Sequence, residues 1–265
     1  MKKLACPQVW PAPWAGWPLV LSILANSSIS AAIPLGFGAL ILGEDKIAVL
    51  SLVLMVTGTV ILFISRGRRV EISDRSMILV YGILKKEVKF SDIGELMSGG
   101  DLSGLHLARA LPGLTMSVAI STLSGCWALY WSLTRVWHTP LAAIASLAGG
   151  ISLQYFMIIS IISPSGGRRF GYGHVLGTSA GAVTLALSSI SPDGVKLILI
   201  LMGGSSLILS LAFSVSPSRM RGIVLMRSVD GKAYPLIAQD SVKLMEELAR
   251  ILRNLGESFR SEGGD

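Results

Sequence analysis

The chain has 265 residues, of which 51% are hydrophobic and 15% are charged, and its formal net charge is +7. Soluble domains carry close to a quarter charged residues, so this composition argues against a soluble globular protein. The mean hydropathy of +0.64 points the same way. Charged residues are concentrated in residues 66–109 and 219–265. Several charge-poor stretches reach the roughly 20 residues that a helix needs to cross a bilayer.

These charge-poor stretches predict six membrane-spanning helices. The fifth is the weakest because it is rich in Gly, Ser, Ala and Thr, and the third and fifth are the two that a lower count would remove. Pro192 and Gly194 separate the fifth from the sixth, since neither residue readily continues a helix. The expected spans are residues 18–42, 47–65, 110–133, 140–163, 171–191 and 195–215.

Aromatic residues at the start of the chain predict an interfacial anchor in front of the first span. Trp10, Trp14 and Trp17 alternate with prolines there, and indole rings favour the headgroup level of a bilayer. Residues 1–65 are therefore expected to comprise this anchor and the first two spans.

The distribution of Lys and Arg predicts the orientation, because cytoplasmic loops are enriched in them. If the N-terminus lies inside, all of the 23 Lys and Arg residues except Lys46, Arg135 and Lys196 fall on the cytoplasmic side. An odd number of spans would put the two basic blocks on opposite sides. We therefore predict a multi-pass protein of the cell membrane with both termini in the cytoplasm. Topology and anionic lipid headgroups explain the positive charge without a nucleic-acid partner.

Residues 66–109 are predicted to form a cytoplasmic, β-rich half-module. The segments 69–73, 77–84 and 86–91 are rich in β-branched or aromatic residues and are bounded by turn-forming residues. Two or three antiparallel strands are expected. They are too few to be stable alone, because even an isolated hairpin is marginal in water.

Residues 216–265 are predicted to supply the other half. Asp230-Gly231 lies between two β-rich runs, which is a hairpin signal. An amphipathic helix follows, with Asp240 as its N-cap and Gly256 at its end. Its apolar stripe is predicted to consist of Val242, Met245, Leu248, Ala249, Leu252 and Leu255.

Both halves are expected on the same side of the membrane. The first has strands but no helix, and the second has an amphipathic helix that needs a sheet to cover. The economical prediction is one small α+β domain whose halves are separated by the last four spans, within residues 110–215. The fold class is thus an α-helical polytopic membrane protein with a small cytoplasmic α+β module.

The two segments together resemble the bacterial pleckstrin-homology-like (PH-like) domains, which often follow a pair of transmembrane helices. The resemblance covers about a quarter of the chain and implies a PH-like fold. Members of that family have seven strands in one continuous domain, whereas about five strands are predicted here and the domain is split. The residues that carry the resemblance are Asp74, Arg75, Tyr81, Gly82, Asp92, Ile93, Asp230, Gly231, Tyr234 and Asp240.

No catalytic, cofactor or metal site is predicted. Apart from Lys196 at the edge of the last one, the predicted spans contain no Asp, Glu, Lys or Arg, and such residues mark most ion pathways inside membranes. None of the histidines (His106, His138 and His174) has a second ligand at metal-binding spacing. Cys6 and Cys126 are not expected to form a disulfide. Asn26, Gln154 and Tyr155 are the other polar residues to note within the spans, and the last two are candidates to line a cavity.

Basic residues are the candidate contacts with anionic lipid headgroups or with a protein partner. They are Arg68, Arg69, Lys85, Lys86 and Lys89 on the module, with Arg168 and Arg169 in a glycine-rich loop. For the last pair, a flexible loop with positive-inside charge is the competing interpretation. In the fifth span, Gly173, Gly177 and Gly181 form a doubled GxxxG pattern, which predicts close helix packing inside the bundle or at a homo-oligomer seam.

Two functions remain open from the sequence. The first is a non-enzymatic membrane scaffold whose PH-like module binds lipid headgroups, a peptide or a partner subunit. The second is a small permease with a polar path through spans three to five, where Ser, Thr and Gly are dense. An enzyme is not expected, because no set of acid, base and nucleophile can be assembled.

Overall fold

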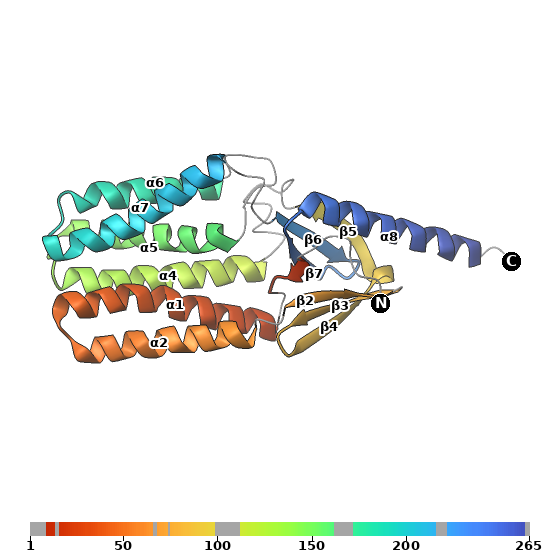
Figure 1. The fold of residues 1–265 in the computed structure, drawn as a ribbon, viewed down its shortest axis with the longest axis horizontal. Helices are drawn as coiled ribbons and strands as arrows, with labels where there is room; N and C mark the ends of the chain where they lie inside the picture. Colours follow the sequence, from red (N-terminus) through yellow and green to blue (C-terminus); the bar gives the residue numbers. More distant parts are fainter. Residues whose placement is uncertain are drawn as a thin grey trace.

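The computed structural model describes residues 9–13, 16–65, 68–73, 75–98, 112–161, 172–215 and 222–262. In these residues the chain forms a bundle of long helices with a small α+β module at one end (Figure 1). Each helix of the bundle coincides with one of the apolar segments predicted from the sequence. The bundle consists of α1 (Trp17–Leu42), α2 (Asp45–Ile64), α4 (Pro112–Thr134), α5 (Pro140–Ile161), α6 (Tyr172–Ser188) and α7 (Asp193–Val215).

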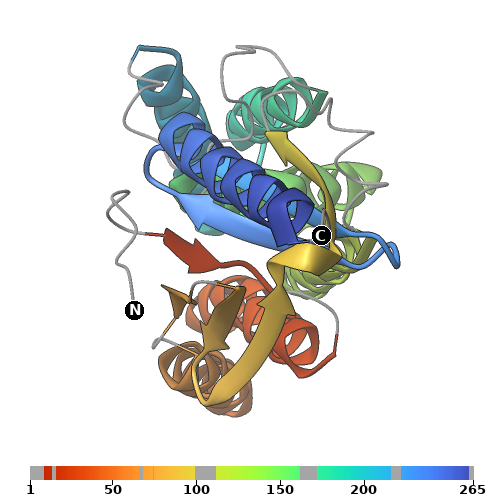
Figure 2. The same ribbon diagram turned by 90° about the vertical axis from the view of Figure 1, so that its right-hand side faces the viewer.

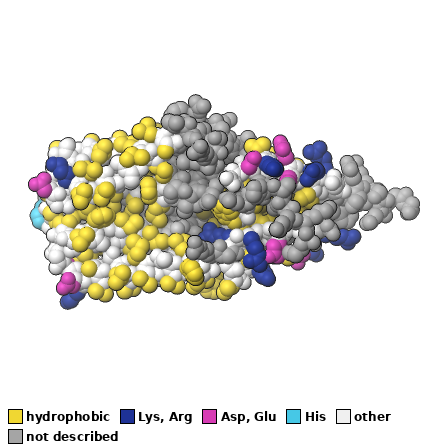
Figure 3. All heavy atoms as spheres, in the orientation of Figure 1, with side chains coloured by type: hydrophobic (Ala, Val, Ile, Leu, Met, Phe, Trp, Pro, Cys, Tyr) yellow, Lys and Arg dark blue, Asp and Glu magenta, His cyan; other side chains and the backbone are white. Residues whose placement is uncertain are grey.

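Four stretches of the described helices are long and apolar enough to cross a membrane. They are α1, α2, Pro140–Met157 of α5 and Asp193–Ala212 of α7, and α6 adds the shorter apolar stretch His174–Ser188. Hydrophobic side chains cover much of the described outer surface of the bundle, whereas charged ones gather at its far end and over the module (Figure 3). A long apolar belt between two charged ends is the surface of a multi-pass membrane protein.

Small and hydroxyl-bearing residues hold the bundle together. α1 packs between α2 and α4, α4 packs on α5, and α5 contacts both α6 and α7. Lipid gives no hydrophobic driving force between helices, so close backbone approach and interhelical hydrogen bonds stabilise the bundle instead. Serine hydroxyls donate to backbone carbonyls of α1 in three places: Ser51 to Ala32 (2.8 Å), Ser124 to Ser27 (3.0 Å) and Ser132 to Pro34 (3.2 Å).

The module contains two antiparallel sheets and one long helix. One sheet has the strand order β2-β3-β4, and the other has the order β1-β7-β6-β5. The strands are β1 (Val9–Pro11), β2 (Arg69–Ile72), β3 (Ser76–Tyr81), β4 (Leu84–Lys89), β5 (Ile93–Ser98), β6 (Gly222–Ser228) and β7 (Ala233–Ala238). A 3-10 turn, η1 (Phe90–Asp92), connects β4 to β5, and α8 (Ser241–Glu262) ends the described chain.

Pairing of β5 with β6 joins the two halves of the module, although residues 99–221 separate them in sequence. Leu96 lies opposite Met226, and Met97 lies opposite Leu225. The two halves also share one apolar core. Its fully buried members are Met77 and Leu79 from β3, Val224 and Met226 from β6, Leu236 and Ala238 from β7, and Leu244 from α8.

The N-terminal segment forms a short strand at Trp10 and Pro11, which was not predicted. These residues lie in β1, where Trp10 pairs with Ile237 and Pro11 with Leu236 at the edge of the larger sheet. Proline has no N–H to donate to a ladder, and an edge strand such as β1 tolerates it because one side of the strand has no neighbour. A three-residue edge strand with a proline is too short to show an alternating pattern, so it could not be predicted from periodicity. Trp17, at the start of α1, is 69% exposed, as an interfacial side chain would be.

The predicted hairpin at Asp230-Gly231 is confirmed, the expected antiparallel strands of the first half include a second hairpin, and glycines with positive φ close both. Gly82 (φ 65°) connects β3 to β4, and Gly231 (φ 83°) connects β6 to β7. Left-handed backbone of this kind carries no steric penalty for glycine. In the second turn Lys232 donates a hydrogen bond to Asp230, which lowers the pKa of that carboxyl to about 2.

The helix α8 lies over the sheet formed by β5, β6 and β7 (Figure 2). Asp240 caps it, as predicted, by accepting a hydrogen bond from the backbone N–H of Lys243 (3.0 Å). The predicted apolar stripe is partly wrong, because Val242 is 65% exposed. The residues that face the core are Leu244, Met245, Leu248, Ile251 and Leu252. The helix also continues through Gly256 to Glu262, since one glycine costs a helix only about 1 kcal/mol.

Arg68 joins the end of α2 to the module. Its guanidinium lies 4.2 Å from the ring centroid of Tyr81, and its Nε donates to the carbonyl of Ser65 (3.0 Å). Burial lowers the pKa of Arg68 and raises the pKa of the Tyr81 hydroxyl. A guanidinium over an aromatic ring is a favourable cation–π arrangement. Arg68 also places a positive charge at the negative end of the α2 dipole.

Replacing this guanidinium is expected to loosen the junction. Arg68→Ala removes the cation–π contact and the bond to a helix-terminal carbonyl, so we expect a loss of about 1–2 kcal/mol. The measurement is the apparent melting temperature in detergent. Arg69→Ala is the matched control, because Arg69 forms a solvent-exposed ion pair with Glu71, and such pairs contribute at most about 1 kcal/mol. Equal melting temperatures for the two variants would contradict this role of Arg68.

Candidate functional site

A cluster of hydrogen-bonded polar side chains lies inside the bundle, where α5, α6 and α7 meet. The Tyr155 hydroxyl is 2.6 Å from Nδ1 of His174, and Ser210 donates to the same hydroxyl at 3.0 Å. The hydroxyls of Thr178 and Ser210 are 3.1 Å apart. Tyr155, His174 and Ser210 are all buried. We call these four residues the polar cluster.

The chemistry of the polar cluster is that of an uncharged chain of donors and acceptors. Because Tyr155 receives the hydrogen of Ser210, its own hydrogen can go to Nδ1 of His174. This assignment places the imidazole proton on Nε2. A chain of this kind can bind a hydroxyl or amide group of a solute by exchanging one of its own bonds, and it requires no fixed charge.

Glycines on α6 allow the polar cluster to form. A side chain at Gly177 would overlap the ring of Tyr155, so only glycine lets α6 approach α5 at this level. At Gly181, one turn further along α6, a Cβ would lie 3.1 Å from the hydroxyl of Ser206 on α7. Ser206 in turn donates to the carbonyl of Gly177 at 3.4 Å. The small-residue face of α6 is therefore packed inside the bundle, against α5 on one side and α7 on the other.

A second buried polar pair lies next to the polar cluster in sequence. Ser30 of α1 donates to Oε1 of Gln154 at 3.1 Å, and both side chains are buried. Gln154 and Tyr155 are neighbours on α5, but Gln154 bonds to α1 whereas Tyr155 bonds to α6 and α7. On the same helix, Ser152 donates to the carbonyl of Met202 on α7 at 2.9 Å. These bonds give α5 polar contacts with three helices and make it the centre of the polar interior.

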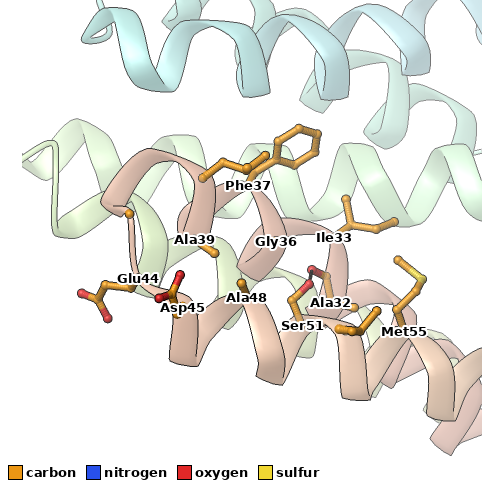
Figure 4. Close-up of a pocket in the computed structure, with 13 residues that line it drawn as sticks. Ala32, Ile33, Gly36, Phe37, Ala39, Glu44, Asp45, Ala48, Ser51 and Met55 are labelled. Atoms are coloured by element: carbon orange, nitrogen blue, oxygen red, sulfur yellow. Dashed lines mark hydrogen bonds between the residues drawn. The ribbon is translucent and has the colours of Figure 1, made fainter.

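A groove lies between α1 and α2 (Figure 4). Its volume is about 770 Å³. Small residues form the bottom of the groove. Gly36 lies against Ser51, and the carbonyl of Ala32 accepts a hydrogen bond from the same serine. Glu44 and Asp45 lie at one end. The groove is lined largely by apolar side chains, and it is separate from the polar cluster.

The predicted contact residues fall into three groups. Arg68 is engaged with Ser65 and Tyr81, and Arg69 is paired with Glu71. The lysines of β4, Lys85, Lys86 and Lys89, have exposed side chains. Arg168 and Arg169 lie outside the described residues, as do Cys6, Trp14 and His106. Among the glycines, Gly173 lies in the first turn of α6, and the structure describes only its backbone.

Sequence reasoning named Tyr155 and His174 separately but did not bring them together, and it missed Thr178 and Ser210. All lie within about two turns of the helix ends that face the module. Each of these residues lies at a similar distance from the module-facing end of its helix, and this shared position in the sequence of the spans was the signal that could have linked them. No group of His, Cys, Asp and Glu suited to a metal ion occurs within the described part of the chain.

Comparison with known proteins finds similarity to transporters. The chain is 28% identical over 167 residues to the citrinin biosynthesis cluster MFS transporter mrr1 of Monascus ruber, a match that covers 60% of this chain and 30% of that protein. The citrinin biosynthesis cluster MFS transporter ctnC of Monascus purpureus is also 28% identical over 167 residues, which is 29% of its length. The chain thus spans less than a third of the length of these curated relatives. It matches no family model and no solved structure.

The close approach of α6 to α5 predicts a specific sensitivity to added volume. Gly177→Ala would force a methyl group into the Tyr155 ring, and overpacking of this kind costs about 1–3 kcal/mol. We expect a melting temperature in detergent several degrees below that of the unmodified chain. Gly204→Ala is the control, because a Cβ at Gly204 of α7 meets nothing within 4 Å. A Gly177→Ala variant as stable as Gly204→Ala would show that this packing is wrong.

Proposed function

We propose that this chain is a transporter-like membrane protein in which a small, uncharged polar solute crosses along the polar faces of α5, α6 and α7. The observation that carries the proposal is the buried polar cluster of Tyr155, His174, Thr178 and Ser210, in which side chains of three helices bond to one another. The similarity to two MFS transporters over 60% of the chain supports it as well. This is the permease interpretation, and these observations favour it over a scaffold without transport.

The solute class follows from the charges. Within the described helices of the bundle, Asp, Glu, Lys and Arg occur only at the helix ends, at Asp45, Lys46, Asp193 and Lys196. An ionic solute would meet no counter-charge along the described path, and a desolvated ion without a partner is costly. Hydroxyls, an imidazole and an amide can replace the water bound to a neutral polar solute.

We also propose six membrane crossings, with both termini in the cytoplasm of a cell-membrane protein. α4 and α6 are less apolar than their neighbours, yet α4 packs between α1 and α5, and α6 packs on α5 and α7. The pairing of β5 with β6 brings the chain back to the side from which it entered α4. Pairing of β1 with β7 puts the start of α1 on that side too, so the first two helices also leave from it and return to it. The excess of Lys and Arg on that side supports its assignment to the cytoplasm.

The module is proposed to be a split PH-like domain that contacts anionic lipid headgroups, which is the second candidate function. Seven strands in two sheets and a closing helix, counted over the described residues, support the resemblance. The exposed lysines of β4 support a lipid contact. Contact with a protein partner or a second copy is the competing form of this proposal. Neither form excludes transport by the bundle.

Solute flux into proteoliposomes tests the transport proposal. Purified full-length protein is reconstituted, and uptake of a panel of small neutral and charged polar solutes is compared with protein-free vesicles. We expect flux for neutral solutes. We expect Tyr155→Phe to change it about tenfold, because losing one hydrogen bond of about 1.4 kcal/mol has that effect.

Ser121→Ala is the matched control for this flux experiment. Its buried hydroxyl donates to the carbonyl of Ser117 in the same helix, so the variant removes a hydroxyl without touching the polar cluster. The control is expected to keep its flux. Flux no greater than that of protein-free vesicles for every solute would sink the proposal, and so would equal effects of the two variants.

A further inference from the structure

The tip of the β3–β4 hairpin lies beside the end of α2. A Cβ at Gly82 would touch the carbonyl oxygen of Ile64 and would lie 3.2 Å from Cα of Ser65. α2 is the most apolar helix, and its last turn presents Phe63 (68% exposed) and Ile64 (47% exposed) to the surroundings. Because those side chains face lipid, the hairpin tip is at the level where the bilayer core gives way to headgroups.

A large apolar side chain projects from this tip. Ile83 follows Gly82 and is 82% exposed. Exposed isoleucines are ordinary on a soluble surface, but this one lies at the membrane boundary on a rigid support. Arg68 fixes the position of the tip, since it bonds to Ser65 at the end of α2 and stacks on Tyr81 next to the turn. The isoleucine is therefore held beside the membrane helix.

Lysines follow the tip along β4 at increasing distance from the membrane. With a rise of about 3.3 Å per residue, Lys85 and Lys86 lie roughly 7–10 Å from Ile83 along the strand, and Lys89 lies roughly 20 Å away. All three side chains are exposed. Glu87 separates the near pair from Lys89, which lies opposite Ser76 at the far end of the sheet. Lysine stems can lie along apolar surface while the ammonium group reaches the headgroup phosphates.

We infer that this hairpin is a membrane anchor: Ile83 inserts into the cytoplasmic interface of the bilayer that holds α2, and Lys85 and Lys86 contact anionic lipid headgroups. An apolar tip flanked by basic side chains combines the two forces that bind interfacial segments, apolar burial and attraction to anionic lipid. In this arrangement Lys85 and Lys86 lie near the membrane, and Lys89, at the far end of the sheet, lies outside the contact surface. The inference deepens the proposed lipid contact of the module and does not depend on transport.

The depth of residue 83 tests the insertion. A nitroxide is attached to Ile83→Cys in the full-length chain carrying Cys6→Ser and Cys126→Ser. The protein is reconstituted in vesicles of equal parts phosphatidylcholine and phosphatidylglycerol. Accessibility to oxygen and to a water-soluble nickel chelate is then measured. The matched site is Arg75→Cys, which is exposed at the opposite end of β3. We expect nickel accessibility at site 83 to be several-fold lower than at site 75, and oxygen accessibility to be higher. Equal accessibility at the two sites would overturn the insertion.

Charge reversal tests the lipid contact separately. Lys85→Glu with Lys86→Glu is expected to raise nickel accessibility at site 83 in the anionic vesicles but not in pure phosphatidylcholine. Lys89→Glu is expected to leave it unchanged in both. If the double variant behaves like Lys89→Glu while site 83 stays buried, the headgroup contact is wrong and the insertion stands. If Lys89→Glu has the larger effect, the assignment of the near pair is wrong.

Discussion

Antiparallel pairing of β5 with β6 is the interaction on which the architecture depends. The two strands are separated by residues 99–221, which contain four helices of the bundle. Neither half of the module has enough strands to bury its apolar face alone, and closing so long a loop carries an entropic cost. The shared core around Met77, Leu79, Val224 and Met226 offsets that cost. The bundle and the module therefore stabilise each other, because a correctly folded bundle brings the strands together and the paired strands fix its ends.

The same constraint shapes the helices. Since the chain must return to the module after α2 and again after α7, the helices come in antiparallel pairs whose ends meet at one face. Serine-to-carbonyl bonds and glycine contacts fill the interior, and they let polar groups be buried without charge. The polar cluster around Tyr155 is the place where several such uncharged polar side chains bond to one another. A scaffold needs hydroxyl bonds only at helix crossings, whereas a path for a neutral solute needs a continuous set of donors and acceptors.

Much of the fold was predictable because its signals are local. Apolar length located every helix of the bundle, and turn residues such as Gly82 and Asp230-Gly231 located two hairpins. The elements that were not predicted correctly, β1, β5 and the buried face of α8, lack a local signal for physical reasons. β1 is a short edge strand carrying Pro11, and β5 follows directly on a 3-10 turn, so neither shows the alternation of a half-buried strand. The face of α8 was misassigned at Val242 because its packing on the sheet, which the helical period does not encode, selects Leu244 instead.

The candidate site was less predictable than the fold. Tyr155 and His174 stood out as rare polar residues in spans, but their contact depends on helix order and depth. Ser210 and Thr178 are indistinguishable in sequence from the many hydroxyls that bond within their own helix, such as Ser121 and Thr184. The lysines of β4 were visible as a group, but only the placement of Gly82 beside Ile64 divides them into near and far members.

An engineered disulfide between β5 and β6 tests whether the two halves of the chain pair in one sheet. Glu95 lies opposite Arg227, and both side chains are more than half exposed, so cysteines at these sites can be bridged without disturbing the core. The variant for this experiment also carries Cys6→Ser, Cys126→Ser and a protease site inserted after Ser165. After oxidation in the membrane and cleavage, we expect two fragments that stay joined without reductant and separate with it. A Glu87→Cys, Arg227→Cys pair, on different sheets, should not join them. Fragments that separate without reductant in the first pair would contradict a module built from both halves of the chain.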